Sequence, residues 1–163
     1  MKLIKVLYII DTVGTEKFKG GGAERSMIEI AIQNKGVTPY FISVYKGVYL
    51  ASLLQEHNIY HVNLGLTDKY GFKKAVEKIL PIIEEIQPDV VHSTLARADF
   101  IARKLKKKTG LPLINSLVSN SFSPDRFKNL SHTAALKLKL VQWKNRLTAH
   151  IPDGFISNSQ SIK

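Results

Sequence analysis

The segment Ile4-Lys5-Val6-Leu7-Tyr8-Ile9-Ile10, followed after a loop by Gly20-Gly21-Gly22-Ala23-Glu24, gives the first indication of the fold. β-branched and large apolar residues fill nearly every position of the first segment, which is typical of a strand covered on both faces. Apolar residues then recur at helical spacing from Ala23 to Ala31, and Gly36 is a suitable helix end. This strand–loop–helix unit predicts the start of a parallel α/β arrangement.

The same alternation continues along the chain. Further strands are expected at 40–45, 59–64, 90–92, 112–117 and 154–157, and helices at 49–57, 72–86, 98–105 and 127–147. Pro81 is expected to kink or restart its helix. Strands joined by long right-handed crossovers form a parallel sheet with helices on both faces. We therefore predict one domain over residues 1–163, an α/β three-layer, doubly wound Rossmann-like parallel sheet.

Composition narrows the classes of site. The 163 residues include no Cys, which excludes a disulfide framework, a thiolate nucleophile and a Cys-ligated metal. The net charge of +11 is uneven, since residues 1–89 hold 11 Lys/Arg and 10 Asp/Glu, whereas residues 90–163 hold 13 and 3. A basic half predicts an anionic partner: nucleic acid, a phosphorylated ligand or an anionic membrane surface.

No targeting or membrane-spanning segment is visible in the sequence. The apolar start of the chain is interrupted by Lys5, ends in Asp11 and lacks a small-residue cleavage pattern. No apolar run approaches the roughly 20 residues that span a bilayer. We expect a cytoplasmic protein, and any membrane contact is expected to be peripheral, on the inner face.

In doubly wound sheets, ligands bind beyond the carboxyl ends of the strands, near the point where strand order reverses. The rule selects the loops 11–22, 45–48, 92–98, 117–126 and 157–160. In the first of them, the glycines before Ala23 allow close backbone approach, and free helix N–H groups favour an anion such as diphosphate. The spacing does not fit the Gly-x-Gly-x-x-Gly fingerprint, and a plain flexible loop is the alternative.

Other polar residues follow the fourth and fifth predicted strands. His92 is expected at the carboxyl end of its strand, either as a general base or as a histidine bonded to loop backbone. Arg97 could clamp an anion, and Asp99 could cap the next helix or complement its dipole. The Ser- and Asn-rich stretch 116–123 could bond sugar hydroxyls or be an ordinary loop.

The predicted helix 126–147 has two apolar sides with basic residues between them. One side can cover the sheet, whereas the opposite side, which holds Trp143, needs a partner. Basic bands beside an apolar face suit an anionic membrane interface, and packing against another helix or domain is the alternative. Nucleic-acid binding is disfavoured because no recognisable binding module is present.

Four motifs in this order resemble the N-terminal domain of GT-B-fold glycosyltransferases of the family-four, retaining type. They are Gly21-Gly22-Ala23-Glu24, Pro88-Asp89-Val90-Val91-His92, Arg97-Ala98-Asp99 with Ala102-Arg103, and Gly154-Phe155-Ile156-Ser157-Asn158-Ser159-Gln160-Ser161. The resemblance covers essentially the whole chain. It implies a second, donor-binding domain that this chain lacks, so the chain alone is expected to be inactive.

The resemblance also implies a function. A hexose would pass from a nucleotide-sugar to a glycan or lipid-linked acceptor of the cell envelope, with no cofactor and no metal. A non-enzymatic Rossmann-like module that binds an anion, either nucleic acid or a regulatory ligand, is the alternative.

Site roles follow from the same resemblance. Gly21 and Gly22 would contact the donor diphosphate. Many members carry a histidine after the fifth strand, where this chain has Ser116 to Asn120, so His92 is the substitute candidate for catalysis. The remaining expected contacts are Arg97 and Asn120 with the acceptor, and Lys139, Trp143 and Lys144 with an anionic membrane.

Overall fold

The computed structural model describes residues 3–68, 70–118 and 123–157. Six parallel strands form one sheet in the order β3-β2-β1-β4-β5-β6. The strands are β1 (Ile4–Ile10), β2 (Val37–Tyr45), β3 (Tyr60–Leu66), β4 (Val90–Thr94), β5 (Leu113–Leu117) and β6 (Gly154–Ser157). Strand order reverses between β1 and β4, which confirms the predicted Rossmann-like architecture.

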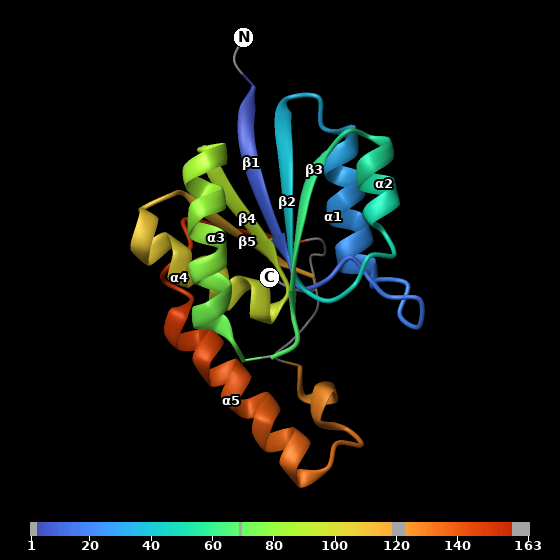
Figure 1. The fold of residues 1–163 in the computed structure, drawn as a ribbon. Coiled ribbons are helices and arrows are strands. Elements are labelled where there is room, and N and C mark those ends of the chain that lie inside the picture. Colours follow the sequence, from blue (N-terminus) through green and yellow to red (C-terminus); the bar gives the residue numbers. More distant parts are fainter. Residues whose placement is uncertain (1–2, 69, 119–122, 158–163) are drawn as a thin grey trace.

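The centre of the sheet is β1, and its side chains alternate between two cores. Val6, Tyr8 and Ile10 pack toward α1 (Gly22–Gln33) and α2 (Ala51–Glu56). Leu7 and Ile9 pack toward α3 (Phe72–Ile86) and α4 (Ala96–Thr109). Figure 1 shows these two helix pairs on opposite faces of the sheet. The apolar density of the segment 4–10 is therefore explained by burial on both faces.

Helix α3 buries its apolar stripe against this sheet. The buried residues are Ala75, Val76, Ile79, Ile83 and Ile86. The helix is continuous through Pro81, so the expected restart does not occur. Burial of the stripe on both sides of Pro81 outweighs the hydrogen bond that proline cannot donate. Helix α4 ends as predicted at Gly110, whose left-handed φ of 74° suits a residue without a Cβ.

Helix α5 (His132–Thr148) begins five residues later than the sequence pattern predicts. A short 3₁₀ turn, Pro124–Phe127, precedes it, and the Ser131 side chain caps the helix by accepting from the Ala134 amide at 3.3 Å. No α5 side chain is fully buried, so the expectation that one apolar side covers the sheet is wrong. The helix contacts α4 and extends past the sheet (Figure 1).

Candidate functional site

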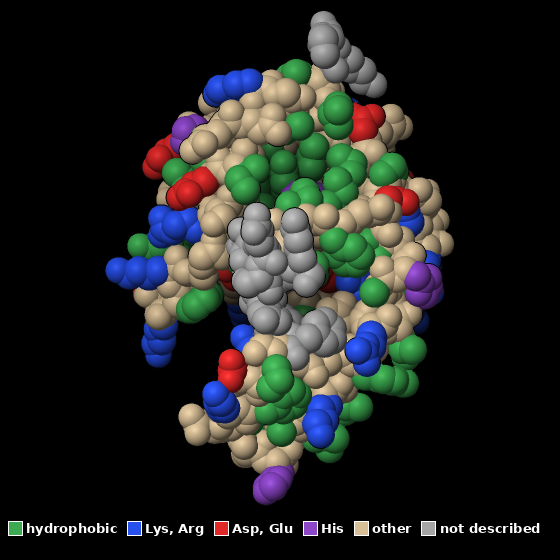
Figure 2. Space-filling view, turned by 180° about the vertical axis from the view of Figure 1, so that it is seen from behind, with side chains coloured by type: hydrophobic (Ala, Val, Ile, Leu, Met, Phe, Trp, Pro, Cys, Tyr) green, Lys and Arg blue, Asp and Glu red, His purple; other side chains and the backbone are tan. Residues whose placement is uncertain are grey.

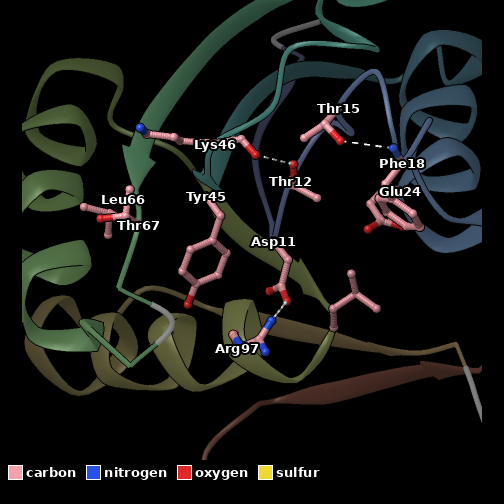
Figure 3. Close-up of a pocket in the computed structure, with 11 residues that line it drawn as sticks. Asp11, Thr12, Thr15, Phe18, Glu24, Tyr45, Lys46, Leu66, Thr67 and Arg97 are labelled. Carbon is pink, nitrogen blue, oxygen red and sulfur yellow. Dashed lines mark hydrogen bonds and ion pairs between the residues drawn. The ribbon is translucent and has the colours of Figure 1, made fainter.

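A cavity of about 410 Å³ opens at the carboxyl ends of β1, β2 and β3, beside the reversal of strand order. Figure 3 shows side chains of the loops after β1 and β2 and of the first turn of α4 around this space. The lining residues are Asp11, Thr12, Thr15, Phe18, Glu24, Tyr45, Lys46, Leu66, Thr67, Leu95 and Arg97. Its position matches the loops selected from the sequence.

An ion pair forms one wall of this cavity. Arg97 Nη1 lies 3.5 Å from Asp11 Oδ2, and the Ala98 amide donates to Asp11 Oδ1 at 2.8 Å. The guanidinium also lies over the ring of Tyr45, 5.6 Å from its centroid. The end of β1 is thereby tied to the start of α4, and Arg97 lines the cavity; its expected contact with the acceptor stays a prediction.

Burial sets the protonation of this carboxylate. Desolvation raises the pKa of Asp11 to about 6, with a smaller contribution from the Glu24 charge, while the Ala98 amide and Arg97 oppose the shift. Burial, followed by the charge of Asp11, raises the pKa of Tyr45 to about 12. Near neutral pH, Asp11 can accept a hydrogen bond or proton, and the Tyr45 phenol remains protonated.

The junction of β4 and α4 is strained. Leu95 has φ 75° and ψ 145°, a conformation that side-chain-bearing residues rarely adopt, and its side chain lines the cavity. Just before it, Thr94 Oγ1 is buried and has no hydrogen-bond partner among the described residues. The strained backbone of Leu95 and the unpaired hydroxyl of Thr94 are therefore adjacent at the cavity edge, and such features are common at functional sites.

The glycine loop lies at the start of α1. Gly21 is the N-cap residue, Gly22 is the first helical residue, and the buried carboxylate of Glu24 lies against Gly21. The space beside Gly22 is open, since a Cβ there would meet no atom within 4 Å. Gly22 is exposed at the start of α1, and the expected contact of this helix start with a diphosphate stays a prediction.

The loops after β1 and β2 approach each other closely next to the cavity. Gly47 has φ 152°, and a Cβ there would collide with the Gly14 carbonyl oxygen and Thr12 Oγ1. The Tyr49 amide donates to the Gly14 carbonyl at 3.1 Å, which fixes the two loops together. Only glycine fits at position 47, so this close approach is specified in the sequence.

His92 lies within β4, two residues before its end, so the expected position at the carboxyl end is wrong. Ser93 and Thr94 extend the strand because they still pair with β1 and β5. His92 Nε2 is 2.8 Å from Ser116 Oγ, the ring is 5.4 Å from that of Tyr8, and burial lowers the pKa of His92 to about 4. The His92 ring therefore bonds a side chain of the neighbouring strand β5, and not the loop backbone that was the expected alternative to a general base.

A second cavity, of about 530 Å³, lies between the starts of α3 and α4 and the middle of α5. It shares Asp11, Leu95 and Arg97 with the first. Its other lining residues are Tyr70, Phe72, Ala96, Phe100, Lys137, Leu140, Val141 and Lys144. The ion pair of Asp11 with Arg97 therefore borders both cavities.

The three residues expected at a membrane differ in their surroundings. Lys144 turns inward, with Nζ 4.5 Å from the ring centroids of both Phe72 and Phe100. Lys139 Nζ lies over Phe127 at 6.0 Å, and Trp143 is 62% exposed. The remaining expected contact, Asn120, lies outside the described residues.

A buried polar network joins β4, α4, β5 and α5. Ser93 Oγ donates to Asp99 Oδ1 at 2.7 Å and accepts from Asn115 Nδ2 at 2.6 Å. Arg103 Nε donates to Asn115 Oδ1 at 2.9 Å, and Arg103 Nη1 donates to Asn145 Oδ1 at 2.6 Å. The motif residues Asp99 and Arg103 thus hold α5 to the domain and do not face either cavity.

Comparison with known proteins gives a match in structure only. No family model and no curated protein matches the chain. The solved structure of Anabaena Alr3699/HepE in complex with UDP-glucose matches with a TM-score of 0.71 at 21% identity, over 98% of this chain and 38% of that one. Acinetobacter baumannii MurG matches with a TM-score of 0.63 at 12% identity, over 98% and 43%.

The fold is one half of a GT-B-type structure. A Listeria monocytogenes protein assigned as a UDP-N-acetylglucosamine 2-epimerase shares the fold, with a TM-score of 0.62 at 15% identity over 99% of this chain and 41% of that one. The chain spans about two fifths of these proteins. At these identities, the likeness establishes the fold and leaves the four-motif family assignment as an expectation.

Several site features are evident only in the structure. Asp11 directly follows β1, and the sequence alone indicates this position at the carboxyl edge of the sheet. Its contact with Arg97, however, depends on the crossover that places β4 and α4 beside β1. Tyr45 and Glu24 also line the cavity without a motif of their own. Among the described residues, no three His, Asp or Glu side chains are placed to hold a metal, and no helix is long and apolar enough to cross a bilayer.

Proposed function

We propose that the chain is the acceptor-side domain of a nucleotide-sugar glycosyltransferase that moves a hexose to a glycan or lipid-linked acceptor of the cell envelope. The cavity at the strand reversal carries this proposal, because the ion-paired carboxylate of Asp11 lines it at the carboxyl edge of the sheet, beside the first turn of α1, which contributes Glu24. The likeness in fold to HepE, whose structure holds UDP-glucose, supports it.

The donor diphosphate would meet the start of α1. The first amides of a helix are free to donate and carry the positive end of the helix dipole, so they favour phosphate oxygens. The open space beside Gly22 allows that approach. Gly21 and Gly22 would therefore contact the diphosphate, and a second domain would hold the nucleotide.

The acceptor hydroxyl would meet Asp11. This carboxylate is 13% exposed, lines the cavity and has a pKa of about 6, so it can accept a hydrogen bond or proton from a sugar hydroxyl. Arg97 would hold Asp11 in place and contact an acceptor oxygen. His92 suits the catalytic role less well, because its Nε2 already pairs with Ser116 and it lines neither cavity.

The acceptor would arrive from the α5 side of the domain. Exposed apolar side chains on this helix are Leu136, Leu140, Trp143 and Leu147. Figure 2 shows hydrophobic and basic side chains intermixed on the lower part of the molecule, which α5 occupies in Figure 1. Lys139 and Trp143 would thus approach an anionic membrane, peripherally and from the cytoplasm.

The test is transfer of radiolabelled hexose by the full gene product from a panel of nucleotide-sugars to membrane extracts and soluble glycans. Asp11→Asn should abolish most transfer, whereas Glu56→Gln, an exposed carboxylate of α2, should leave it unchanged. Absence of both transfer and nucleotide-sugar hydrolysis across the panel would contradict the proposal. Salt-dependent binding to RNA or DNA in its place would favour the anion-binding module.

A nucleotide-sugar epimerase is a second candidate, because the epimerase-assigned Listeria protein has the same fold over 99% of this chain. Proton NMR of UDP-N-acetylglucosamine incubated with the protein in D₂O distinguishes the two. Exchange and inversion at C2 with no acceptor present would indicate the epimerase. Transfer that requires an acceptor would indicate the glycosyltransferase.

A further inference from the structure

The cavity bordered by α3, α4 and α5 combines an apolar wall with a row of cations. Phe72, Phe100, Leu140 and Val141 provide the wall, and Arg97, Lys137 and Lys144 provide the charge. Its volume of about 530 Å³ lies within the roughly 300–1,000 Å³ typical of small-molecule sites. An apolar cavity with convergent charges at one edge suits a ligand that has both an apolar and an anionic part.

Lys144 is the central cation of this cavity. Its ammonium lies 4.5 Å from two ring centroids, and burial, followed by the nearby charge of Lys104, lowers the pKa of Lys144. Among the described residues, neither Lys144 nor Lys137 forms an ion pair. Holding a desolvated ammonium beside another cation is costly, and an anionic ligand would relieve that cost.

Among the described lining residues, the charges outside the ion pair of Asp11 with Arg97 are all positive. Asp11 is the cavity's one carboxylate among the described lining residues, and that side chain is already paired with Arg97. Residues 126–152, which include all of α5, contain six Lys/Arg and no Asp or Glu. Leu140, which lines the cavity, and Leu136, about one helical turn before it on α5, are both exposed. These charges favour a negatively charged ligand, whose apolar part would find exposed leucines along α5.

We propose that this cavity binds the phosphate or diphosphate of a lipid phosphate, with the head group at Lys137 and Lys144 and the first apolar units against Phe72 and Leu140. The inference rests on the proposed function, since it makes the acceptor a lipid-carried one. The cavity shares Asp11 and Arg97 with the first. A sugar attached to the head group would therefore reach the residues that face the donor.

Binding can be measured by isothermal titration of the protein with farnesyl diphosphate, farnesol and inorganic pyrophosphate, all without detergent. Farnesyl diphosphate should bind at least about tenfold more tightly than either part alone. Equal binding of farnesol would show an apolar pocket with no anion site. Equal binding of pyrophosphate would show an anion site with no lipid. Either result overturns the proposal.

Matched variants locate the site. Lys144→Met keeps the apolar stem over the two rings and removes the charge, and it should weaken farnesyl diphosphate binding about tenfold. Lys78→Met, at an exposed lysine of α3 that lies outside the cavity, should change it less than twofold. Equal losses in both variants would place the effect in general surface charge and overturn the proposal. Thermal unfolding of each variant checks that the fold is intact.

Two further comparisons distinguish lipid-phosphate binding in the cavity from general membrane binding and from the proposed transfer activity. Binding to phosphatidylglycerol vesicles without binding to monomeric farnesyl diphosphate would show that the domain has only a membrane-binding surface. That result would overturn the proposal that the cavity binds a lipid phosphate. The titration contains no nucleotide-sugar, so its result does not depend on transfer. Transfer to a soluble glycan without farnesyl diphosphate binding would uphold the proposed function and reject the lipid phosphate.

Discussion

Arg97 Nη1 lies 3.5 Å from Asp11 Oδ2, and this pair borders both cavities at the place where the two halves of the sheet meet. Asp11 directly follows the central strand β1, and Arg97, 86 positions later in the chain, belongs to the first turn of α4. The pair is thus a product of the crossover between β3 and β4. It is also the point at which activity, protonation and local strain can be tested.

Replacing the Asp11 carboxylate distinguishes a role in sugar transfer from a role in stability. Asp11→Asn retains an oxygen that can accept from the Ala98 amide, so its free energy of unfolding should change by no more than about 1 kcal/mol. Loss of the proton acceptor should lower kcat/KM for sugar transfer by about 100-fold or more. Steady-state kinetics and urea unfolding check both parts. Unchanged kinetics would remove Asp11 from the mechanism.

The start of α1 offers a substitution that the structure tolerates. Gly22→Ala places its methyl group in open space and should keep the free energy of unfolding within about 0.5 kcal/mol of wild type. The same methyl group would obstruct a diphosphate on the helix N-terminus, so donor KM should rise about tenfold. Gly154→Ala, also unobstructed, is the control. A normal donor KM in Gly22→Ala would argue against this phosphate site.

The raised pKa of the buried Asp99 carboxyl leads us to expect an unusual pH dependence of stability. Burial raises the pKa of Asp99 to about 7, whereas its unfolded pKa lies near 3.8, so the folded protein binds the extra proton between these values. Wild type should therefore lose stability relative to Asp99→Asn as pH rises from 4 to 7, by roughly 2–4 kcal/mol. Urea unfolding at several pH values measures this difference. Parallel curves for the two proteins would refute the raised pKa.

The buried guanidinium of Arg103 should hold α5 in place. Arg103→Met removes its bonds to Asn115, Asn145 and Thr148 and leaves buried polar groups unpaired. We expect a loss of about 3–5 kcal/mol and faster amide exchange along α5. Lys104→Met, the exposed neighbour, should change stability by less than about 0.5 kcal/mol. Protected α5 amides in Arg103→Met would show that another contact fixes the helix.

The strain at Leu95 can be measured with a pair of variants. Both Leu95→Ala and Leu95→Gly remove the side chain, but only glycine adopts the φ of 75° readily. The glycine variant should therefore be more stable than the alanine variant by about 1 kcal/mol, the reverse of the usual order. Denaturant unfolding of the two variants is the test. An alanine variant of equal or greater stability would mean that the conformation is not strained.

The sequence predicted the strands and most helices well because hydrophobic periodicity reports burial directly. The segment 4–10 and the stripe of α3 are read in this way, and Gly110 marks a real helix end. The pattern failed over 127–131, where helical spacing continues but a 3₁₀ turn and the Ser131 cap intervene. A side-chain cap competes locally with the helix, and periodicity does not register it.

The candidate site was only partly predictable. The glycine loop and Arg97 follow from the rule that ligands lie at the carboxyl ends of parallel strands. By residue type alone, the sequence offers Asp99, Arg103 and His92 equally as functional-site candidates. In the structure, Asp99 and Arg103 belong to a buried hydrogen-bond network, and His92 pairs with Ser116. Residue type identifies a group that can do chemistry, and its contacts decide whether it is free to do so.

The sequence by itself determined the order of strands and helices, the two-sided burial of β1, and the concentration of positive charge in residues 90–163. These properties are local or additive, so they are present in the chain before it folds. Only the tertiary structure decided that Asp11 meets Arg97, that Lys144 lies between two aromatic rings, and that α5 extends beyond the sheet. Those relationships depend on contacts between residues far apart in the chain, which no local pattern encodes.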